Sequence, residues 1–159
     1  MLFRSQATTS GTSIPFASIP SWVKRITVLF NAVSTNSTNP LLIQIGTGGA
    51  ATTSGYASSA CVTSNVSNNS TAGSSNTNGF AVYSNSASNT TSGTMIIANV
   101  SGNIWVENHT MYQAGSNYTV YGGGVITLAG ALNYLRLISS ATGSPSDTFD
   151  GGSINILYE

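Results

Sequence analysis

The feature that most constrains this chain is a succession of short apolar runs separated by turn-forming residues. The clearest run spans residues 22–33, where Trp22, Ile26, Val28 and Phe30 lie an even number of positions apart. Apolar residues with a period of two indicate a strand that buries one face. We therefore expect a long strand here, with Trp22 and Phe30 as core residues.

Further runs of the same kind follow along the chain, each four to nine residues long. They span residues 41–45, 56–62, 80–83, 94–100, 104–112, 118–121, 125–129, 132–138 and 153–158. Glycine, asparagine, serine and threonine separate them, as is typical of turns. On this basis residues 122–124, three consecutive glycines, are interpreted as a hairpin turn. Pro15 and Pro20 are expected to stop pairing before the first long strand.

No segment shows ten to twelve residues of helical apolar periodicity with a cap, and no heptad pattern is present. Short strands at near-regular spacing favour a sandwich or a jelly roll. The sequence thus predicts one all-β domain over residues 1–159, an antiparallel β-sandwich or jelly roll of about eight to ten short strands. Residues 1–11 are a candidate N-terminal arm. The low-complexity stretch 63–78 is predicted to be an exposed loop, either a contact surface or a plain connection.

Charge is scarce, with four basic and four acidic residues and a formal net charge of zero. Only 5% of the residues are charged, against about 25% in an average soluble domain. Such a surface has no basic face to neutralise phosphates, so nucleic acid is not an expected partner. It also gives little charge repulsion against self-association.

The first ten residues lack the apolar core of a signal peptide, and no run approaches the length of a membrane span. The sequence therefore predicts a protein made in the cytoplasm and not inserted into a membrane. Cys61 is the single cysteine, which leaves no partner for an intrachain disulfide. A free cysteine is most often a small buried hydrophobe, and that is the role expected for Cys61.

No residue set suited to catalysis is apparent, and no cofactor or metal is expected. His109 is the single histidine, and no nucleophile elbow accompanies it. Asp147 and Asp150 are the two carboxylates closest in sequence. They are expected to cap a turn. The functional alternative is a weak Ca²⁺ site, in which the two carboxylates supply hard oxygen ligands.

Aromatic residues near side-chain amides are the remaining candidates for a functional role. Trp105, Tyr112, Tyr118 and Tyr121 fall on adjacent predicted strands, and exposed rings suit neutral ligands such as sugars. These four residues are the candidate ligand contacts. For Trp105, as for Trp22, core packing is the favoured alternative, while for Tyr118 and Tyr121 the two interpretations are evenly balanced.

Four segments are similar to segments of many tailed-phage and prophage virion proteins. They are residues 19–35 (IPSWVKRITVLFNAVST), 41–46 (LLIQIG), 132–137 (LNYLRL) and 147–159 (DTFDGGSINILYE). In that family the domain usually closes a longer tail-fibre or tail-spike-like polypeptide. This chain differs from the family in two respects. The resemblance is lost at the low-complexity stretch, and the domain here stands alone behind its own Met1.

The resemblance implies a structural role on the phage particle, as a homotrimer, and it carries over no catalytic residue. Arg25 and Arg136 are candidates to pair with Asp147 or Asp150, a contact worth only about 0–1 kcal/mol if exposed. The expected location is the virion. The expected partners are further copies of the chain, other virion proteins (a fibre adaptor, the tail or the capsid) and a bacterial surface glycan.

The favoured function is thus a fibre or tail-fibre-type module for host attachment or fibre assembly. A capsid decoration protein is the alternative. A polysaccharide-degrading enzyme that uses Glu107, Asp147 or Asp150 is a distant third, and we expect no enzymatic activity.

Overall fold

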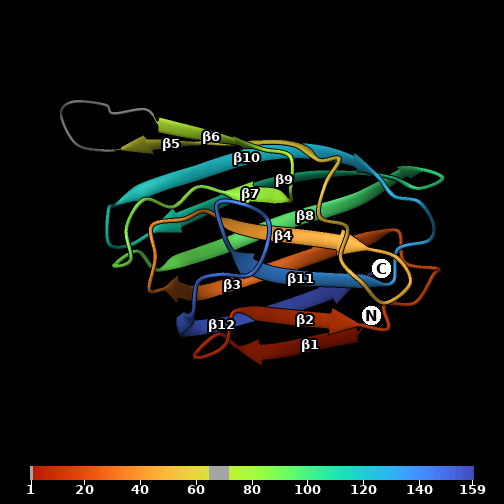
Figure 1. Ribbon diagram of the computed structural model, residues 1–159, viewed down its shortest axis with the longest axis horizontal. Coiled ribbons are helices and arrows are strands. Elements are labelled where there is room, and N and C mark those ends of the chain that lie inside the picture. The colour runs from red at the N-terminus through yellow and green to blue at the C-terminus, as the bar shows by residue number, and fades with distance from the viewer. Residues whose placement is uncertain (1, 65–71) are drawn as a thin grey trace.

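The computed structural model describes residues 2–64 and 72–159. Over these residues the chain forms twelve strands and no helix, arranged in two sheets whose described pairings are all antiparallel (Figure 1). The all-β antiparallel sandwich expected from the sequence is confirmed, as a single compact domain, but with twelve strands among the described residues instead of about eight to ten.

The larger sheet has eight strands and the smaller has four. The order across the larger sheet is β1 (Leu2–Ala7), β12 (Phe149–Tyr158), β3 (Arg25–Thr35), β8 (Thr91–Ser101), β9 (Ile104–Gln113), β10 (Tyr118–Thr127), β5 (Ala57–Ser64) and β6 (Ala72–Asn76). The order across the smaller sheet is β2 (Ser13–Ala17), β11 (Tyr134–Ser139), β4 (Leu41–Gly46) and β7 (Phe80–Val82).

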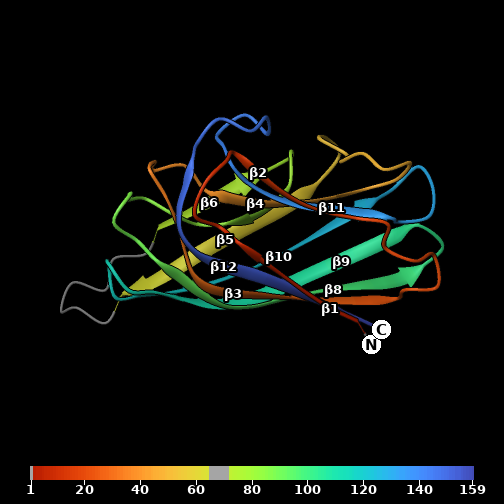
Figure 2. The same ribbon diagram turned by 90° about the horizontal axis from the view of Figure 1, so that it is seen from below.

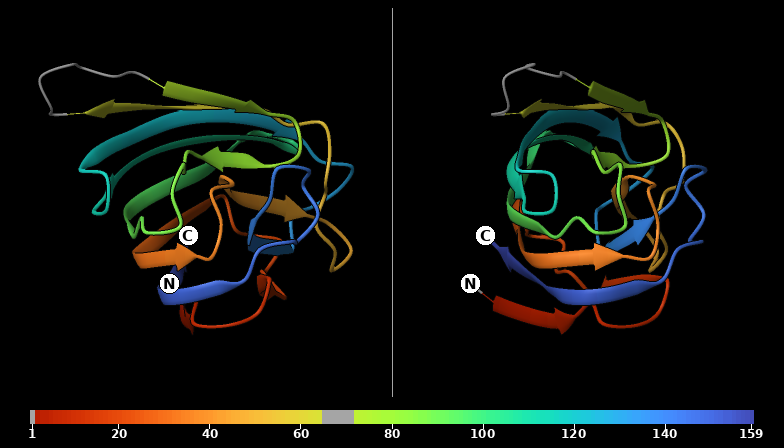
Figure 3. Two further views of the ribbon diagram at one scale, coloured as in Figure 1. Left: turned by 60° about the vertical axis from the view of Figure 1, so that its left-hand side comes forward. Right: turned by 90° about the vertical axis from the view of Figure 1, so that its left-hand side faces the viewer.

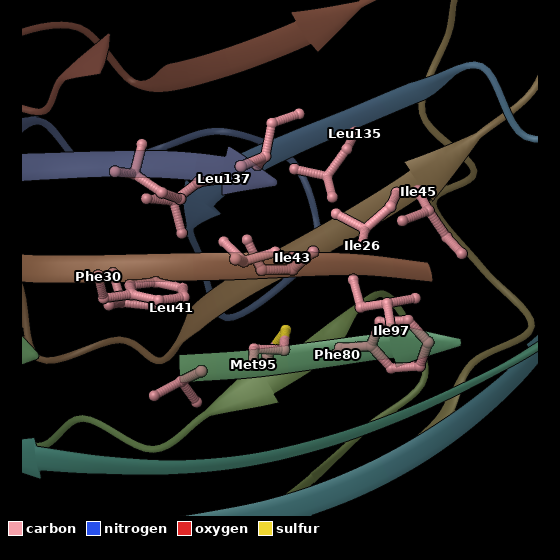
Figure 4. Packing of buried hydrophobic residues seen from close by; sticks show 14 of the residues in the cluster. Ile26, Phe30, Leu41, Ile43, Ile45, Phe80, Met95, Ile97, Leu135 and Leu137 are labelled. Atoms are coloured by element: carbon pink, nitrogen blue, oxygen red, sulfur yellow. The ribbon is translucent and has the colours of Figure 1, made fainter. Parts of the chain in front are cut away.

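The larger sheet curves around the smaller one, so that the concave face of the first encloses the second (Figures 2 and 3). Alternation along the strands explains the core between them, because residues two apart in a strand share a face. Ile26, Phe30, Met95 and Ile97 from β3 and β8 meet the inward side chains of the smaller sheet (Figure 4). Those partners include Ile43, Ile45, Leu135 and Leu137.

Strand β4 is buried along its whole length, on both faces. On its outward side Leu42 packs with Ala81 and Ile138 in a second, small cluster. The buried amide of Gln44 donates hydrogen bonds to the carbonyl oxygens of Asn78 and Gly143, at 2.6 and 2.9 Å. Two loops are thereby tied over the outer side of the smaller sheet, which satisfies a buried polar group.

The prediction of an N-terminal arm over residues 1–11 is wrong for most of its length. Leu2–Ala7 is strand β1, which pairs with β12 from Leu2 opposite Tyr158 to Ala7 opposite Ser153. The two ends of the chain therefore lie side by side. Pro15 does not stop pairing either, since β2 contains it. This strand lies at an edge of its sheet, where a residue without an N–H group is tolerated.

The predicted loop over residues 63–78 is partly wrong. Thr63 and Ser64 still belong to β5, and Ala72–Asn76 forms β6, which pairs with β5 at the other edge of the larger sheet. The intervening residues 65–71 lie outside the described residues. The register explains the difference, because the polar run of β6 needs only backbone hydrogen bonds to β5.

Residues 122–124 are not a hairpin turn but the middle of β10, paired with β5 on one side and β9 on the other. The two predicted strands 118–121 and 125–129 are thus one strand.

The prediction that Trp22 is a core residue is wrong. Strand β3 begins at Arg25, and Trp22 precedes it with 58% of its surface exposed. Phe30, in contrast, is buried as predicted.

Candidate binding surface

The convex side of the larger sheet carries the candidate surface. Along β9 the odd-numbered residues from Trp105 to Gln113 are buried and the even-numbered ones are exposed from Val106 to Tyr112. Cross-strand register extends this outward face over β10, β5 and β8. We call the outward residues of these four strands the outer face.

The outer face has no ionisable acid or base side chain of the Asp, Glu, Lys, Arg or His type. It consists of hydroxyl, amide, small apolar and tyrosine side chains, with one thiol. Its members are Ala57, Ser59, Cys61 and Thr63 of β5; Ser92, Thr94, Ile96, Ala98 and Val100 of β8; Val106, Asn108, Thr110 and Tyr112 of β9; and Thr119, Tyr121, Gly123, Val125 and Thr127 of β10.

Two exposed groups stand out on this face. Val106 lies directly opposite Val125, and both are more than one third exposed. Tyr112 lies opposite Thr119, so Tyr121 is its diagonal neighbour on the next strand. Diagonal positions are about 7–8 Å apart, within reach of aromatic side chains. The two tyrosines, 49% and 44% exposed, thus lie on adjacent strands of the same face, and we call this pair the tyrosine platform.

The polar end of the platform is fixed by the turn between β9 and β10. The hydroxyl of Tyr112 donates a hydrogen bond of 2.8 Å to Oδ1 of Asn117. Asn117 adopts a left-handed backbone conformation, with a φ of 54°, which asparagine tolerates better than most residues. One tyrosine ring is thus oriented by a side chain that its own hairpin supplies.

The structure separates the four predicted ligand contacts into two pairs. Tyr112 and Tyr121 lie on the outer face. Trp105 is 3% exposed and belongs to the hydrophobic core, and Tyr118 is half-buried and packs against that core. The alternation explains the division, because Trp105 faces inward on β9 and Tyr118 starts β10 on its inward side.

Cys61 also lies on the outer face, where it pairs in register with Tyr121 on β10 and Gly73 on β6. It is exposed, so the expectation that it is a buried hydrophobe is wrong. Its neighbours Ala60 and Val62 take the inward positions of β5, and alternation leaves the thiol outward.

Sequence reasoning missed a pair of ionisable residues on the inward side of β9. Nδ1 of His109 lies 2.6 Å from Oε1 of Glu107, and both side chains are fully buried. Residues two apart on a strand share a face, which is the signal that would have found this pair. Because the core encloses it, the pair has no access to a substrate on the surface.

The carboxylates proposed as a turn cap or Ca²⁺ site have separate partners. Oδ2 of Asp147 accepts hydrogen bonds from Asn39 at 3.0 Å and from Ser139 at 2.7 Å, whereas Asp150 lies in β12 and accepts one from Ser34. Burial would raise the pKa of Asp147, but hydrogen bonds from Asn39, Ser139, Ser146 and Ser37 outweigh it and lower this pKa.

Neither aspartate is paired with an arginine among the described residues. Nε of Arg136 donates instead to Oε1 of Gln44 at 2.7 Å, and the one ion pair in the described part of the chain is Glu107–His109. Within the same residues, no group of three or more His, Cys, Asp or Glu side chains is placed to hold a metal ion. No pocket opens on the described surface.

A convex, charge-free face with a tyrosine platform can bind a partner through apolar contact and hydroxyl or amide hydrogen bonds. The described residues include no helix that could cross a membrane. Comparison of the chain with protein-family models, with curated proteins and with solved structures gives no match.

Proposed function

We propose that this protein is a binding and assembly module of a phage particle, a fibre or tail-fibre-type structural protein that contacts its partners through the outer face. The observation that carries the proposal is the outer face itself, which has no charged side chain over four adjacent strands and exposes Tyr112 and Tyr121. A water-facing sheet usually carries charged residues, and their absence favours contact with a neutral partner.

The chemistry of the platform favours a sugar. The apolar face of a pyranose ring stacks on an aromatic ring, while its hydroxyls bond to polar groups at the edge. Thr110 and Thr119 lie opposite Tyr121 and Tyr112 in the register and supply such groups. The proposed ligand is therefore a neutral glycan of a bacterial surface, with further copies of the chain and other virion proteins as assembly partners.

The proposed location on a phage particle rests on the resemblance of residues 19–35, 41–46, 132–137 and 147–159 to segments of virion proteins. In the structure most of these segments are core strands, including β3, β4 and β12. The outer face lies on β5, β8, β9 and β10, which are largely outside those segments.

The test is adsorption of the purified protein to host cells and to their isolated polysaccharide. Tyr112→Ala together with Tyr121→Ala is expected to reduce adsorption at least tenfold, since stacking on a ring contributes about 1 kcal/mol or more for each. Trp22→Ala is the matched control, because it removes an exposed ring that lies outside the outer face. Adsorption should also change little between low and high salt, since no charge takes part.

Failure of the native protein to adsorb, or to compete with phage adsorption, contradicts the proposal. Imaging of intact particles tests the location. Copies at the tail agree with a fibre module, whereas hundreds of copies on the head indicate the alternative of capsid decoration. Turnover of the polysaccharide that is lost on Glu107→Gln, Asp147→Asn or Asp150→Asn, with folding retained, replaces the proposal by the enzymatic alternative.

A further inference from the structure

Two buried side-chain amides lie behind the tyrosine platform, at the end of β9. Gln113 is the last residue of β9, and Asn89 belongs to the segment 83–90 between β7 and β8; both are buried. Nδ2 of Asn89 donates a hydrogen bond of 3.3 Å to Oε1 of Gln113. Neighbouring residues of a strand face opposite sides, so this amide pair lies inward of Tyr112, the exposed residue just before Gln113.

Both amides use both of their N–H groups. Nε2 of Gln113 donates hydrogen bonds to the carbonyl oxygen of Tyr83 and to Oγ1 of Thr91. Nδ2 of Asn89 donates its second bond to Oδ1 of Asn85, at 3.1 Å. A buried polar network with its donors paired holds its members in one geometry, because a rearrangement would leave polar groups without partners.

The network is joined to the turn between β9 and β10, residues 114–117. Oγ of Ser116 donates a hydrogen bond of 2.8 Å to Oδ1 of Asn89. The backbone N–H of Ala114 donates to the carbonyl oxygen of Thr90, at 3.1 Å. Two residues of the turn are thus bonded to the segment 83–90.

Between these two bonds the turn lies directly against the same segment. A Cβ on Gly115 would lie 2.6 Å from the carbonyl oxygen of Ser88 and 2.8 Å from Oδ1 of Asn89. The contact therefore requires a residue without a side chain. Three successive residues of the turn are held by hydrogen bonds or by close packing.

The fourth residue of the turn, Asn117, connects it to the aromatic ring. Oδ1 of Asn117 accepts the hydrogen bond of 2.8 Å from the hydroxyl of Tyr112. The backbone N–H of Asn117 donates to the carbonyl oxygen of Ala114, at 3.4 Å. A displacement of the turn thus moves Asn117, and the hydroxyl of Tyr112 must follow it or lose its partner.

We propose that Asn89 and Gln113 are positioning residues of the tyrosine platform, which act through the turn 114–117 to hold Tyr112 in the orientation that the partner meets. Both are buried, so neither touches the partner. The inference rests on the proposed function for what the platform binds. It adds that recognition depends on residues behind the outer face, because a ring held in place before binding loses less conformational entropy when the partner arrives.

The first test needs no ligand. Ser116→Ala removes the hydroxyl that joins the turn to Asn89 and leaves the buried amides in place. Nitrogen-15 relaxation of the native protein is expected to give residues 114–117 order parameters of about 0.85, as in rigid backbone. These values should fall in Ser116→Ala. Order parameters below about 0.6 for this turn in the native protein, or native values in Ser116→Ala, overturn the proposal.

The hydroxyl of Tyr112 supplies a second readout in the same samples. The carbon-13 resonance of its Cζ atom reports on the hydrogen bond to Asn117. Asn117→Gly removes that bond and keeps a residue that tolerates the left-handed φ of 54°. We expect the Cζ resonance in Ser116→Ala to move toward its position in Asn117→Gly. A resonance that stays at its native position in Ser116→Ala contradicts the proposal.

Two control variants show whether the bond itself is responsible. Ser116→Thr keeps the hydroxyl and should keep the native order parameters and the native Cζ resonance. Ser86→Ala removes a hydroxyl of the segment 83–90 that is bonded to Ser88 and not to the turn, and it should also be native in both. A loosened turn in either variant contradicts the role given to the bond between Ser116 and Asn89.

Adsorption to the isolated host polysaccharide tests the effect on binding. Ser116→Ala and Asn117→Gly are each expected to weaken adsorption about two- to tenfold, the range for one side chain that must be ordered on binding. In a Tyr112→Phe background Ser116→Ala should weaken adsorption no further, because the hydroxyl through which the turn acts is already gone. A loss of general structural origin would persist in that background and would overturn the proposal.

Asn89→Ala is the direct variant, and it should loosen the turn and weaken adsorption as Ser116→Ala does. If Asn89→Ala does not fold, Ser116→Ala decides the question, since it leaves the buried network intact. A native protein that does not adsorb, with a rigid turn that Ser116→Ala loosens, contradicts the proposed function. Adsorption that is strong in the native protein and unchanged in Ser116→Ala contradicts this inference alone.

Discussion

Two aromatic residues of the first long apolar run show how far a period of two can be trusted. Phe30 lies inside β3 and is buried, whereas Trp22 lies three residues before that strand and is 58% exposed, its ring tilted against Tyr158. The periodicity is the same for both. It describes side-chain direction only where the backbone is a strand.

Phe30→Ala is therefore expected to lower the free energy of unfolding by about 3–5 kcal/mol, because it leaves a cavity in the core. Trp22→Ala should cost less than ~1 kcal/mol, since most of that ring already meets water. Urea unfolding of both variants is the measurement. Similar costs for the two residues would contradict the placement of Trp22 outside the core.

The role of Gly122 depends on residues of the two neighbouring strands. A methyl group there would lie 2.5 Å from Cε1 of His109 and 2.5 Å from the carbonyl oxygen of Ser59. Real Cβ atoms do not approach so closely, so the strands or the imidazole must move. The sequence suggests flexibility at this position, while the structure requires the absence of a side chain.

Gly122→Ala is expected to destabilise the protein by about 1–3 kcal/mol through overpacking. Gly123→Ala, one residue on and directed outward, meets a single atom at 3.2 Å and should cost clearly less. Thermal unfolding of the pair compares them within one strand. Equal melting temperatures would show that β10 lies farther from His109 than described.

At the scale of elements, the loop between β11 and β12 is held by hydrogen bonds to a carboxylate. Asp147 receives one from Asn39, in the loop before β4, and one from Ser139 at the end of β11. These bonds lower the pKa of Asp147 against the opposing effect of burial. The charged form is thus favoured by folding, and the folded form is favoured when the carboxyl is charged.

The stability that Asp147 contributes should therefore be present above about pH 4 and lost as pH falls through its lowered pKa. Asp147→Asn is expected to reduce stability by at most ~1 kcal/mol at pH 6, since the site is partly exposed to solvent. The difference from the native protein should shrink below about pH 3. Denaturant unfolding at pH 6 and pH 3 checks this, with Asp150→Asn as the control. A difference that grows in acid would contradict it.

At the scale of the whole molecule, the pairing of β1 with β12 joins the two ends of the chain. The backbone N–H of Thr8 extends it to the carbonyl oxygen of Gly152, at 3.0 Å. Most neighbours in the larger sheet are distant in sequence, as are β12 and β3 or β10 and β5. Long-range pairing requires large loops to close before the contacts stabilise them.

Folding is accordingly expected in milliseconds to seconds, as is usual for sandwiches with non-local contacts. Stopped-flow refolding followed by tryptophan fluorescence is the measurement, with buried Trp105 as the reporter. Trp22→Phe removes the exposed indole and should leave the refolding rate unchanged. Refolding within microseconds would contradict a topology in which the first and last strands pair.

Much of the architecture can be predicted from local patterns in this sequence. The lack of helical periodicity and the spacing of apolar residues determined the all-β class and most strand positions, because side-chain direction in a strand depends on neighbouring residues alone. The scarcity of charge determined in the same way that any exposed face would be nearly neutral. The same local information pointed to Trp105, Tyr112, Tyr118 and Tyr121 together, and only the structure shows that Tyr112 and Tyr121 are the two exposed rings.

Only the tertiary structure decided which strands are neighbours, and with them the surroundings of each residue. It made residues 2–7 an edge strand on β12, continued β10 through three glycines, and placed Glu107 beside His109 inside the sandwich. It also turned Trp22 and Cys61 outward. These outcomes depend on hydrogen bonds and close contacts between segments far apart in the chain, which no local pattern encodes.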